Sequence, residues 1–228
     1  MPTDDKGKTL WELFLQRIHH GGNNGSGLPF YNPRAILVGS PFAIPYANGP
    51  VFADHDFTVR EIREYNRRIA GQEYRFVDYI LSGIDQKSFA AADGIDVRLR
   101  AVPNAAGAHD ALLLRLEDEF AFAEDFLSVV QDQTGVFEIT DDDSGARVTF
   151  RRINELKESY LAAVLVVAAT TPEGKAVSNQ VAPVQIEYWD YWREVDLGGG
   201  NTAKEFVFVE MNRESGWFQI WRGREFFS

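Results

Sequence analysis

Residues 188–195 read Tyr-Trp-Asp-Tyr-Trp-Arg-Glu-Val and hold two of the five tryptophans of the chain. Two further runs follow, Glu-Phe-Val-Phe-Val-Glu-Met at 205–211 and Trp-Phe-Gln-Ile-Trp-Arg at 217–222. Aromatic and β-branched residues are enriched in strands, and all three runs are rich in them. The sequence therefore predicts a three-stranded antiparallel unit near the C-terminus.

The chain from residue 74 onward also alternates between candidate strands and turn-forming residues. Candidate strands at 74–81, 95–102 and 111–116 are bounded by Ser-Gly, Asp-Gly and Pro-Asn pairs. Two hairpins are predicted, one joining 136–140 to 146–153 and one joining 156–170 to 176–195. Successive hairpins indicate an α+β fold that is mainly antiparallel β, as a curled sheet, a barrel or a sandwich.

Helices are predicted at the N-terminus and at one or two further places. Thr9 and Glu12 have the spacing of a capping box, and apolar residues follow at helical spacing as far as Ile18. This amphipathic helix docks either on its own domain or on another chain. Short helices are also expected at 121–130 and at 58–71, where a strand is the alternative.

The domain organisation is predicted from a glycine-rich stretch at 21–27, which is typical of a flexible connector. We expect residues 1–27 to form the N-terminal helix and its tether. Residues 28–228 are expected to form a single β-rich domain, because a chain of 228 residues is long enough to bury a substantial core.

The negative charge is concentrated in an acidic segment, residues 110–143, which has eleven acidic residues and only one basic residue. It therefore accounts for nearly all of the net charge of -11. Without a basic surplus elsewhere, nucleic acid is not an expected partner. The segment is either a solvated face or a docking surface for a cationic ligand or a basic protein, and Asp141, Asp142 and Asp143 are its docking candidates.

Several classes of chemistry have no signature in the sequence. The absence of cysteine excludes disulfides and thiolate catalysis and is typical of a reducing compartment. P-loop, zinc-protease and nucleophile-elbow motifs are absent, so we expect no cofactor and no metal. A polar N-terminus and apolar runs far shorter than the roughly 20 residues of a membrane helix favour a cytoplasmic protein without a membrane partner.

Charged residues on apolar strand faces are the remaining signal. Alternation places Asp190 on a face with aromatic residues, and Glu210 and Arg222 likewise share faces with apolar residues. A buried carboxylate without a partner is costly, so we expect Asp190 or Glu210 to pair with Arg222 or Arg193. Candidate ligand-binding residues in the same unit are Trp189, Tyr191, Arg193, Trp221 and Arg222.

Two functions fit these features. The sequence favours a soluble, non-enzymatic binding or assembly module with an acidic face, which predicts paired carboxylates and no deep polar pocket. The alternative is a carbohydrate-active or related enzyme, in which Asp190 and Glu210 act as general acid and base and aromatic rings stack on the sugar. That alternative requires both carboxylates to lie in one open cleft.

Overall fold

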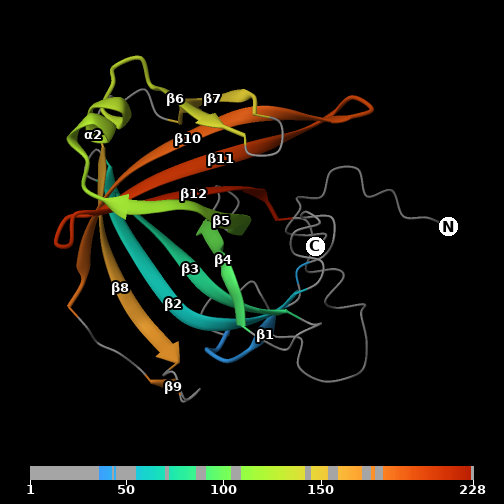
Figure 1. Cartoon of the computed structure of the whole chain (residues 1–228). Coiled ribbons are helices and arrows are strands. Elements are labelled where there is room, and N and C mark those ends of the chain that lie inside the picture. Colours follow the sequence, from blue (N-terminus) through green and yellow to red (C-terminus); the bar gives the residue numbers. More distant parts are fainter. Residues whose placement is uncertain are drawn as a thin grey trace.

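Twelve strands and one short helix make up the described part of the chain in a computed structural model (Figure 1). The structure describes residues 36–42, 44, 55–69, 72–85, 91–103, 109–141, 145–153, 159–170, 176–177 and 182–226. In chain order the elements are β1 (Pro41–Phe42), β2 (His55–Ile69), β3 (Gln72–Asp85), β4 (Ala91–Pro103), β5 (His109–Ala121), α2 (Glu124–Val130), β6 (Val136–Thr140), β7 (Arg147–Arg152), β8 (Tyr160–Thr170), β9 (Ala176–Val177), β10 (Val184–Gly198), β11 (Asn201–Asn212) and β12 (Trp217–Glu225).

Eight long strands close into an antiparallel barrel. Around the barrel they follow the order β2-β3-β4-β5-β12-β11-β10-β8, and β8 closes the ring by pairing with both β10 and β2. Every neighbouring pair is antiparallel. The predicted mainly antiparallel fold is confirmed. Closure gives hydrogen-bond partners to the backbone groups that the edge strands of an open sheet would leave unpaired.

Irregular pairing helps this sheet to curl. Register shifts occur between Val59 and Glu61 where β2 meets β3, and between Ile62 and Arg63 where β2 meets β8. A third lies in the pairing of β12 with β5, between Ile220 and Trp221. Each bulge bends its strand and increases the local twist, which brings β2 and β10 to the two sides of β8.

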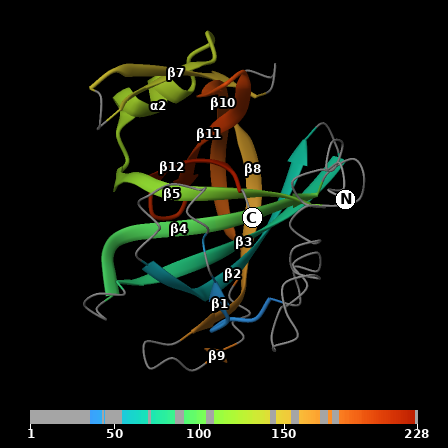
Figure 2. The ribbon, with the colours of Figure 1, turned by 90° about the vertical axis from the view of Figure 1, so that its right-hand side faces the viewer.

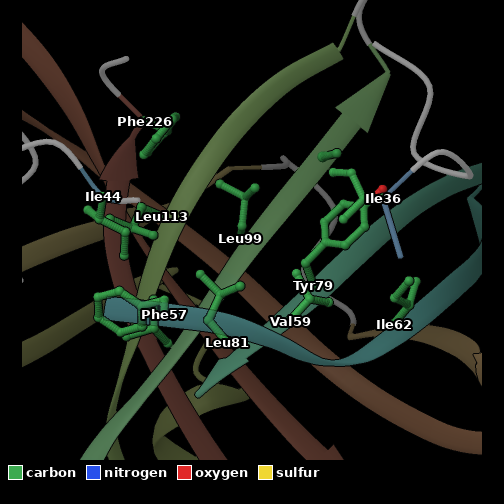
Figure 3. Close-up of a cluster of buried hydrophobic side chains, with 12 residues drawn as sticks. Ile36, Ile44, Phe57, Val59, Ile62, Tyr79, Leu81, Leu99, Leu113 and Phe226 are labelled. Carbon is green, nitrogen blue, oxygen red and sulfur yellow. The ribbon is translucent and has the colours of Figure 1, made fainter. Parts of the chain in front are cut away.

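A first outer cluster covers the face of β2–β5 that points away from the barrel interior. Ile36 and Ile44 from the N-terminal segment lie beside the strand side chains, as Figure 3 shows. Phe226 joins the same cluster just after β12, and its backbone N–H donates a hydrogen bond to the carbonyl of Ala111 (2.8 Å). Segments that precede and follow the barrel strands in the sequence therefore bury this face.

A second outer cluster covers β10, β11 and β12. The helix α2 and the hairpin of β6 and β7 lie over these strands, while β1 and β9 lie at the opposite end (Figures 1 and 2). Trp189, Tyr191 and Phe218 are fully buried there, together with Phe137 and Phe150 from the hairpin. The aromatic unit predicted at the C-terminus is thus a double-sided wall, with one face in this cluster and the other inside the barrel.

Most predicted elements are found, with one correction. The helix at 121–130 is confirmed as α2, and the two hairpins and the three-stranded unit are antiparallel as expected. The helix preferred at 58–71 is wrong, because these residues belong to β2. Ile62 and Tyr65 have helical spacing in the sequence, but in a strand residues three positions apart point to opposite faces, so Ile62 packs in the first outer cluster and Tyr65 in the barrel interior. The N-terminal helix and tether at 1–27 lie outside the described residues.

Candidate functional site

Two ion pairs cross the interior of the barrel and join into one buried network. Arg98 and Arg100 are on β4, two residues apart, so alternation points both side chains inward. The Nη1 atom of Arg98 lies 2.8 Å from Glu210 Oε1 and 3.1 Å from Asp78 Oδ2. Arg100 forms a two-pronged contact with Asp78, through Nε at 2.8 Å and Nη2 at 2.9 Å, and Nη2 also donates to Glu210 Oε1 at 2.8 Å.

Aromatic faces surround the two guanidinium groups. Arg98 lies 3.8 Å from the centroid of the Trp221 ring, and it has no exposed surface. Arg100 lies 4.5 Å from the ring of Phe76 and 4.6 Å from the ring of Phe208. An aromatic face attracts a cation, so these rings replace part of the water that the arginines lose on burial. The barrel interior is therefore a charged layer between aromatic and aliphatic side chains.

The network holds Glu210 in its ionised form. Burial alone would raise the pKa of its carboxyl group, but the charges of Arg98 and Arg100 and their hydrogen bonds lower the pKa to about 2. The hydroxyl of Tyr65 lies 3.4 Å from Glu210 Oε2 and accepts a hydrogen bond from Arg98 Nη1 at 3.2 Å. Burial, in turn, raises the pKa of the Tyr65 hydroxyl.

A further, looser ion pair lies in the same interior, apart from that network. Arg67 Nη1 is 3.3 Å from Asp190 Oδ2 and donates to the hydroxyl of Tyr188 at 3.1 Å. The Oδ1 atom of Asp190 has no hydrogen-bond partner among the described residues. Burial raises the pKa of Asp190 to about 6, and the nearby charges of Arg67 and Arg100 offset that rise only in part.

A cavity of about 380 Å³ lies toward the end of the barrel where β11 turns into β12. Its aliphatic wall comes from the neighbouring strands β8 and β10, and its polar side comes from β2, β5, β11 and β12. The lining residues are Arg63, Tyr65, Glu119, Val164, Val166, Val184, Ile186, Glu210, Asn212, Ser215, Trp217 and Gln219. The cavity therefore meets the buried network at Tyr65 and Glu210.

The polar groups of the cavity are positioned by rigid strands. Arg63 on β2 donates from Nε to Glu61, two residues earlier on the same face. Gln219 on β12 is the register partner of Glu119 on β5, and its side-chain amide donates to the Glu119 carboxylate. Trp217 is 46% exposed and also lines the cavity, so it lies at the rim. The cavity thus combines an aliphatic wall with fixed donors and acceptors.

The sequence-predicted residues divide between the two faces of the barrel wall. Asp190, Glu210 and Trp221 point inward, as their pairing register and their contacts show. Trp189 and Tyr191 lie in the second outer cluster, beneath α2 and the β6–β7 hairpin. The five predicted ligand-binding residues therefore do not surround one site, since only Trp221 points into the barrel interior.

The arginines predicted as partners bind a different carboxylate. Arg193 and Arg222 both contact Glu205 on the outer face of β11, and the Arg222 Nε to Glu205 Oε1 distance is 3.1 Å. The inner carboxylates pair instead with arginines of β2 and β4. The pairing of β8 with both β2 and β10 brings Arg67 near Asp190, and closure of the barrel brings the arginines of β4 across the interior from Glu210 of β11.

One residue of the predicted acidic docking group has a described partner. Asp141 Oδ2 lies 3.4 Å from Arg222 Nη2. Asp142 and Asp143 lie outside the described residues.

Sequence reasoning missed the arginines that organise this site. Arg98 and Arg100 alternate with Val97, Leu99 and Ala101 in a strand that was correctly located. Two arginines on one face of a strand whose other face is fully apolar are a signal for a charged interior. Arg63 and Glu119 carry no comparable signal, because their place in the cavity depends on strands that are far apart in the chain.

The described residues contain no group of three or more His, Cys, Asp or Glu side chains that could hold a metal ion. Within the same part of the chain, no helix has the length and apolar character needed to cross a membrane. Comparison with protein-family models, with curated proteins and with solved structures finds no significant match to this chain.

Proposed function

We propose that this protein is a non-enzymatic binding module that takes one small amphipathic molecule into the cavity of its barrel. The observation that carries the proposal is the cavity itself, which lies at one end of a closed barrel and has an aliphatic wall facing polar groups. Its volume of about 380 Å³ is within the range of known small-molecule sites, which begins near 300 Å³. This departs from our expectation that a binding module would have no deep polar pocket.

The rigidity of the site supports binding. Glu210 and Tyr65, at the inner side of the cavity, are already fixed by Arg98 before any ligand arrives. A ligand therefore does not need to order these side chains, and the entropy cost of binding is correspondingly lower.

The alternative function, an enzyme with Asp190 and Glu210 as general acid and base, has weaker support than the binding module. Of its two carboxylates, Glu210 lines the cavity, whereas Asp190 is not among the described residues that line it. A pKa of about 2 makes Glu210 a weak base and keeps it from acting as a general acid near neutral pH. Its two arginine partners also occupy the oxygen atoms that would face a substrate.

A fluorescent titration tests the proposed binding. N-phenyl-1-naphthylamine is uncharged at neutral pH and becomes fluorescent in an apolar site, and we expect it to saturate at one molecule per chain. Val184→Trp, in the aliphatic wall, should fill the cavity and weaken binding at least tenfold. Val136→Trp is the matched control, because Val136 is an exposed residue of β6 outside the barrel.

The controls decide how the titration is interpreted. Circular dichroism and thermal melting should show that both variants remain folded. If the probe does not bind the unmodified protein, or if Val184→Trp binds it as tightly as Val136→Trp does, the proposed function is wrong.

A further inference from the structure

The charges that point into the barrel are balanced, except for that of Glu119, which is an exposed residue in the lining of the cavity. Glu210 is compensated by Arg98 and Arg100, and Arg63 by Glu61. Glu119 also lines the cavity, but among the described residues its carboxylate receives a side-chain hydrogen bond only from Gln219, which is neutral. A cavity residue therefore carries a negative charge that has no cationic partner in the described part of the chain.

An aromatic ring lies next to this charge. Glu119 pairs with Gln219 across β5 and β12, and Trp217 pairs with Ala121 two positions further along the same two strands. Glu119 and Trp217 are therefore diagonal neighbours on one face of the sheet, within reach of a common ligand. A carboxylate beside an exposed indole ring is a favourable setting for an ammonium group, which is attracted by both.

The aliphatic wall lies across the cavity from this pair. Val164 and Val166 come from β8, and Val184 and Ile186 from β10, whereas Glu119 and Trp217 come from β5 and β12. In the barrel order, β11 separates the two groups. A ligand that fills the cavity therefore has its apolar body against β8 and β10 and its charged end toward β5 and β12.

We propose that the cavity selects an amphipathic monocation, an alkyl or aryl body that carries one ammonium group, and that the ammonium group binds between Glu119 and Trp217. This inference rests on the proposed function and specifies its ligand class.

An anionic ligand of the same size fits less well. A ligand carboxylate in the cavity would lie near Glu119 and Glu210. The lining has one cationic side chain, that of Arg63, and it is already paired with Glu61. The acidic segment, to which Glu119 belongs, adds further negative charge around this side of the barrel and favours the approach of cations.

Three ligands of equal chain length distinguish the effect of the charged group on affinity from the effect of the apolar body. Octylamine, octan-1-ol and octanoate differ only in the group at the end of the chain, which at pH 7 is cationic, neutral or anionic. Calorimetric titration should give the order octylamine, then octanol, then octanoate. Octylamine should bind about fivefold more tightly than octanol, which is at the upper end of the range for a partly exposed ion pair.

Substitution of Glu119 tests whether its carboxylate causes the preference for octylamine over octanol. Glu119→Gln should remove the preference for octylamine over octanol and leave the affinity for octanol within about twofold. Glu138→Gln is the matched control, since Glu138 is an exposed residue of β6 outside the barrel, and it should retain the full preference.

The outcomes separate the inference from the function on which it rests. If octanol binds as tightly as octylamine, or if Glu119→Gln retains the preference, the cation site is wrong and the proposed binding function stands. Tighter binding of octanoate would overturn the inference in the same way. If none of the three ligands binds and N-phenyl-1-naphthylamine also fails to bind, both proposals are wrong.

Discussion

The buried charges of this barrel are organised around two arginines of one strand. Arg98 and Arg100 face Asp78 and Glu210, so two cations meet two anions in a space with almost no exposed surface. Removing charges from water costs several kcal/mol per ion, and close multiple contacts are needed to offset that cost. Each arginine therefore contacts both carboxylates, and loss of any one member would leave an uncompensated charge.

Asp190 differs from Glu210 because it has one arginine partner and an oxygen without a hydrogen bond among the described residues. Its pKa of about 6 lies above the ordinary value of 3.8, so the folded protein binds the proton more tightly than the unfolded chain does. The stabilisation from this protonation is fully present below about pH 4 and is lost as the pH rises through 6.

A change of Asp190 to asparagine should therefore alter how stability depends on pH. The unmodified protein should lose roughly 1 to 2 kcal/mol between pH 5 and pH 8 through this group, and Asp190→Asn should not show that loss. Urea unfolding at the two pH values measures the difference. Asp196→Asn, an exposed change on the same strand, should follow the unmodified protein, and equal pH dependence of all three proteins would contradict the prediction.

At the scale of the strands, the contact between β5 and β12 depends on a residue without a side chain. Gly223 pairs with Leu114, and a Cβ atom at Gly223 would lie only 1.8 Å from the carbonyl oxygen of Leu113. No side chain can move to relieve that overlap, because the obstructing atoms belong to the backbone.

Gly223→Ala should therefore separate β12 from β5 and destabilise the barrel by about 3 kcal/mol or more, as overpacking against rigid neighbours does. Gly200→Ala is the comparison, because Gly200 has a φ of 81° but nothing within 4 Å of the added Cβ. It should cost only the backbone strain, about 1 kcal/mol. Denaturant unfolding of both variants tests this prediction, and similar unfolding midpoints would contradict it.

The acidic segment gives a prediction about Asp141, Asp142 and Asp143. Replacing Asp141, Asp142 and Asp143 together by asparagine keeps their turn propensity and removes three charges. Arg222 would retain Glu205 as a partner, so the folded state should be barely affected. If the three residues form a docking surface, calorimetry should show weaker binding of spermidine. Equal affinity of the variant, or no binding by the unmodified protein, would leave these residues as a solvated turn.

At the scale of the whole molecule, the barrel wall separates three buried regions. The interior holds the charges and the cavity, and each of the two outer clusters is covered by other parts of the chain. Ile36 and Ile44, which cover one outer face, both follow residue 27. Residues 1–27 precede both of them, and the glycine-rich stretch at 21–27 leads us to expect that the N-terminal helix is separate from this core.

Deletion of residues 1–27 should accordingly leave a folded barrel with a melting temperature within a few degrees of that of the full chain. A helix that covered the core would contribute several kcal/mol at about 25 cal/mol per Å² of apolar surface buried. Thermal melting of the truncated chain distinguishes the two cases. Insolubility or a large fall in melting temperature would show that the helix docks on its own domain.

The sequence by itself determined most of the segments that become strands, β2 excepted, and which of their residues share a face, because alternation and turn chemistry are local properties. It located the unit at 188–222 and placed Asp190 and Glu210 on apolar faces, in agreement with the structure. It also contained the arginines of β4, but an Arg-x-Arg pattern alone does not reveal what they face.

Only the tertiary structure decided the partners of these charges and the position of the cavity. Glu210 meets Arg98 and Arg100 because β4 and β11 lie across the barrel from each other, separated by more than 100 residues of chain. Closure depends on strand pairing between distant segments, and in β2 this pairing overrides the helical spacing of the apolar residues. Long-range pairing leaves no periodic trace in the sequence, which is why the local elements could be predicted and the cavity could not.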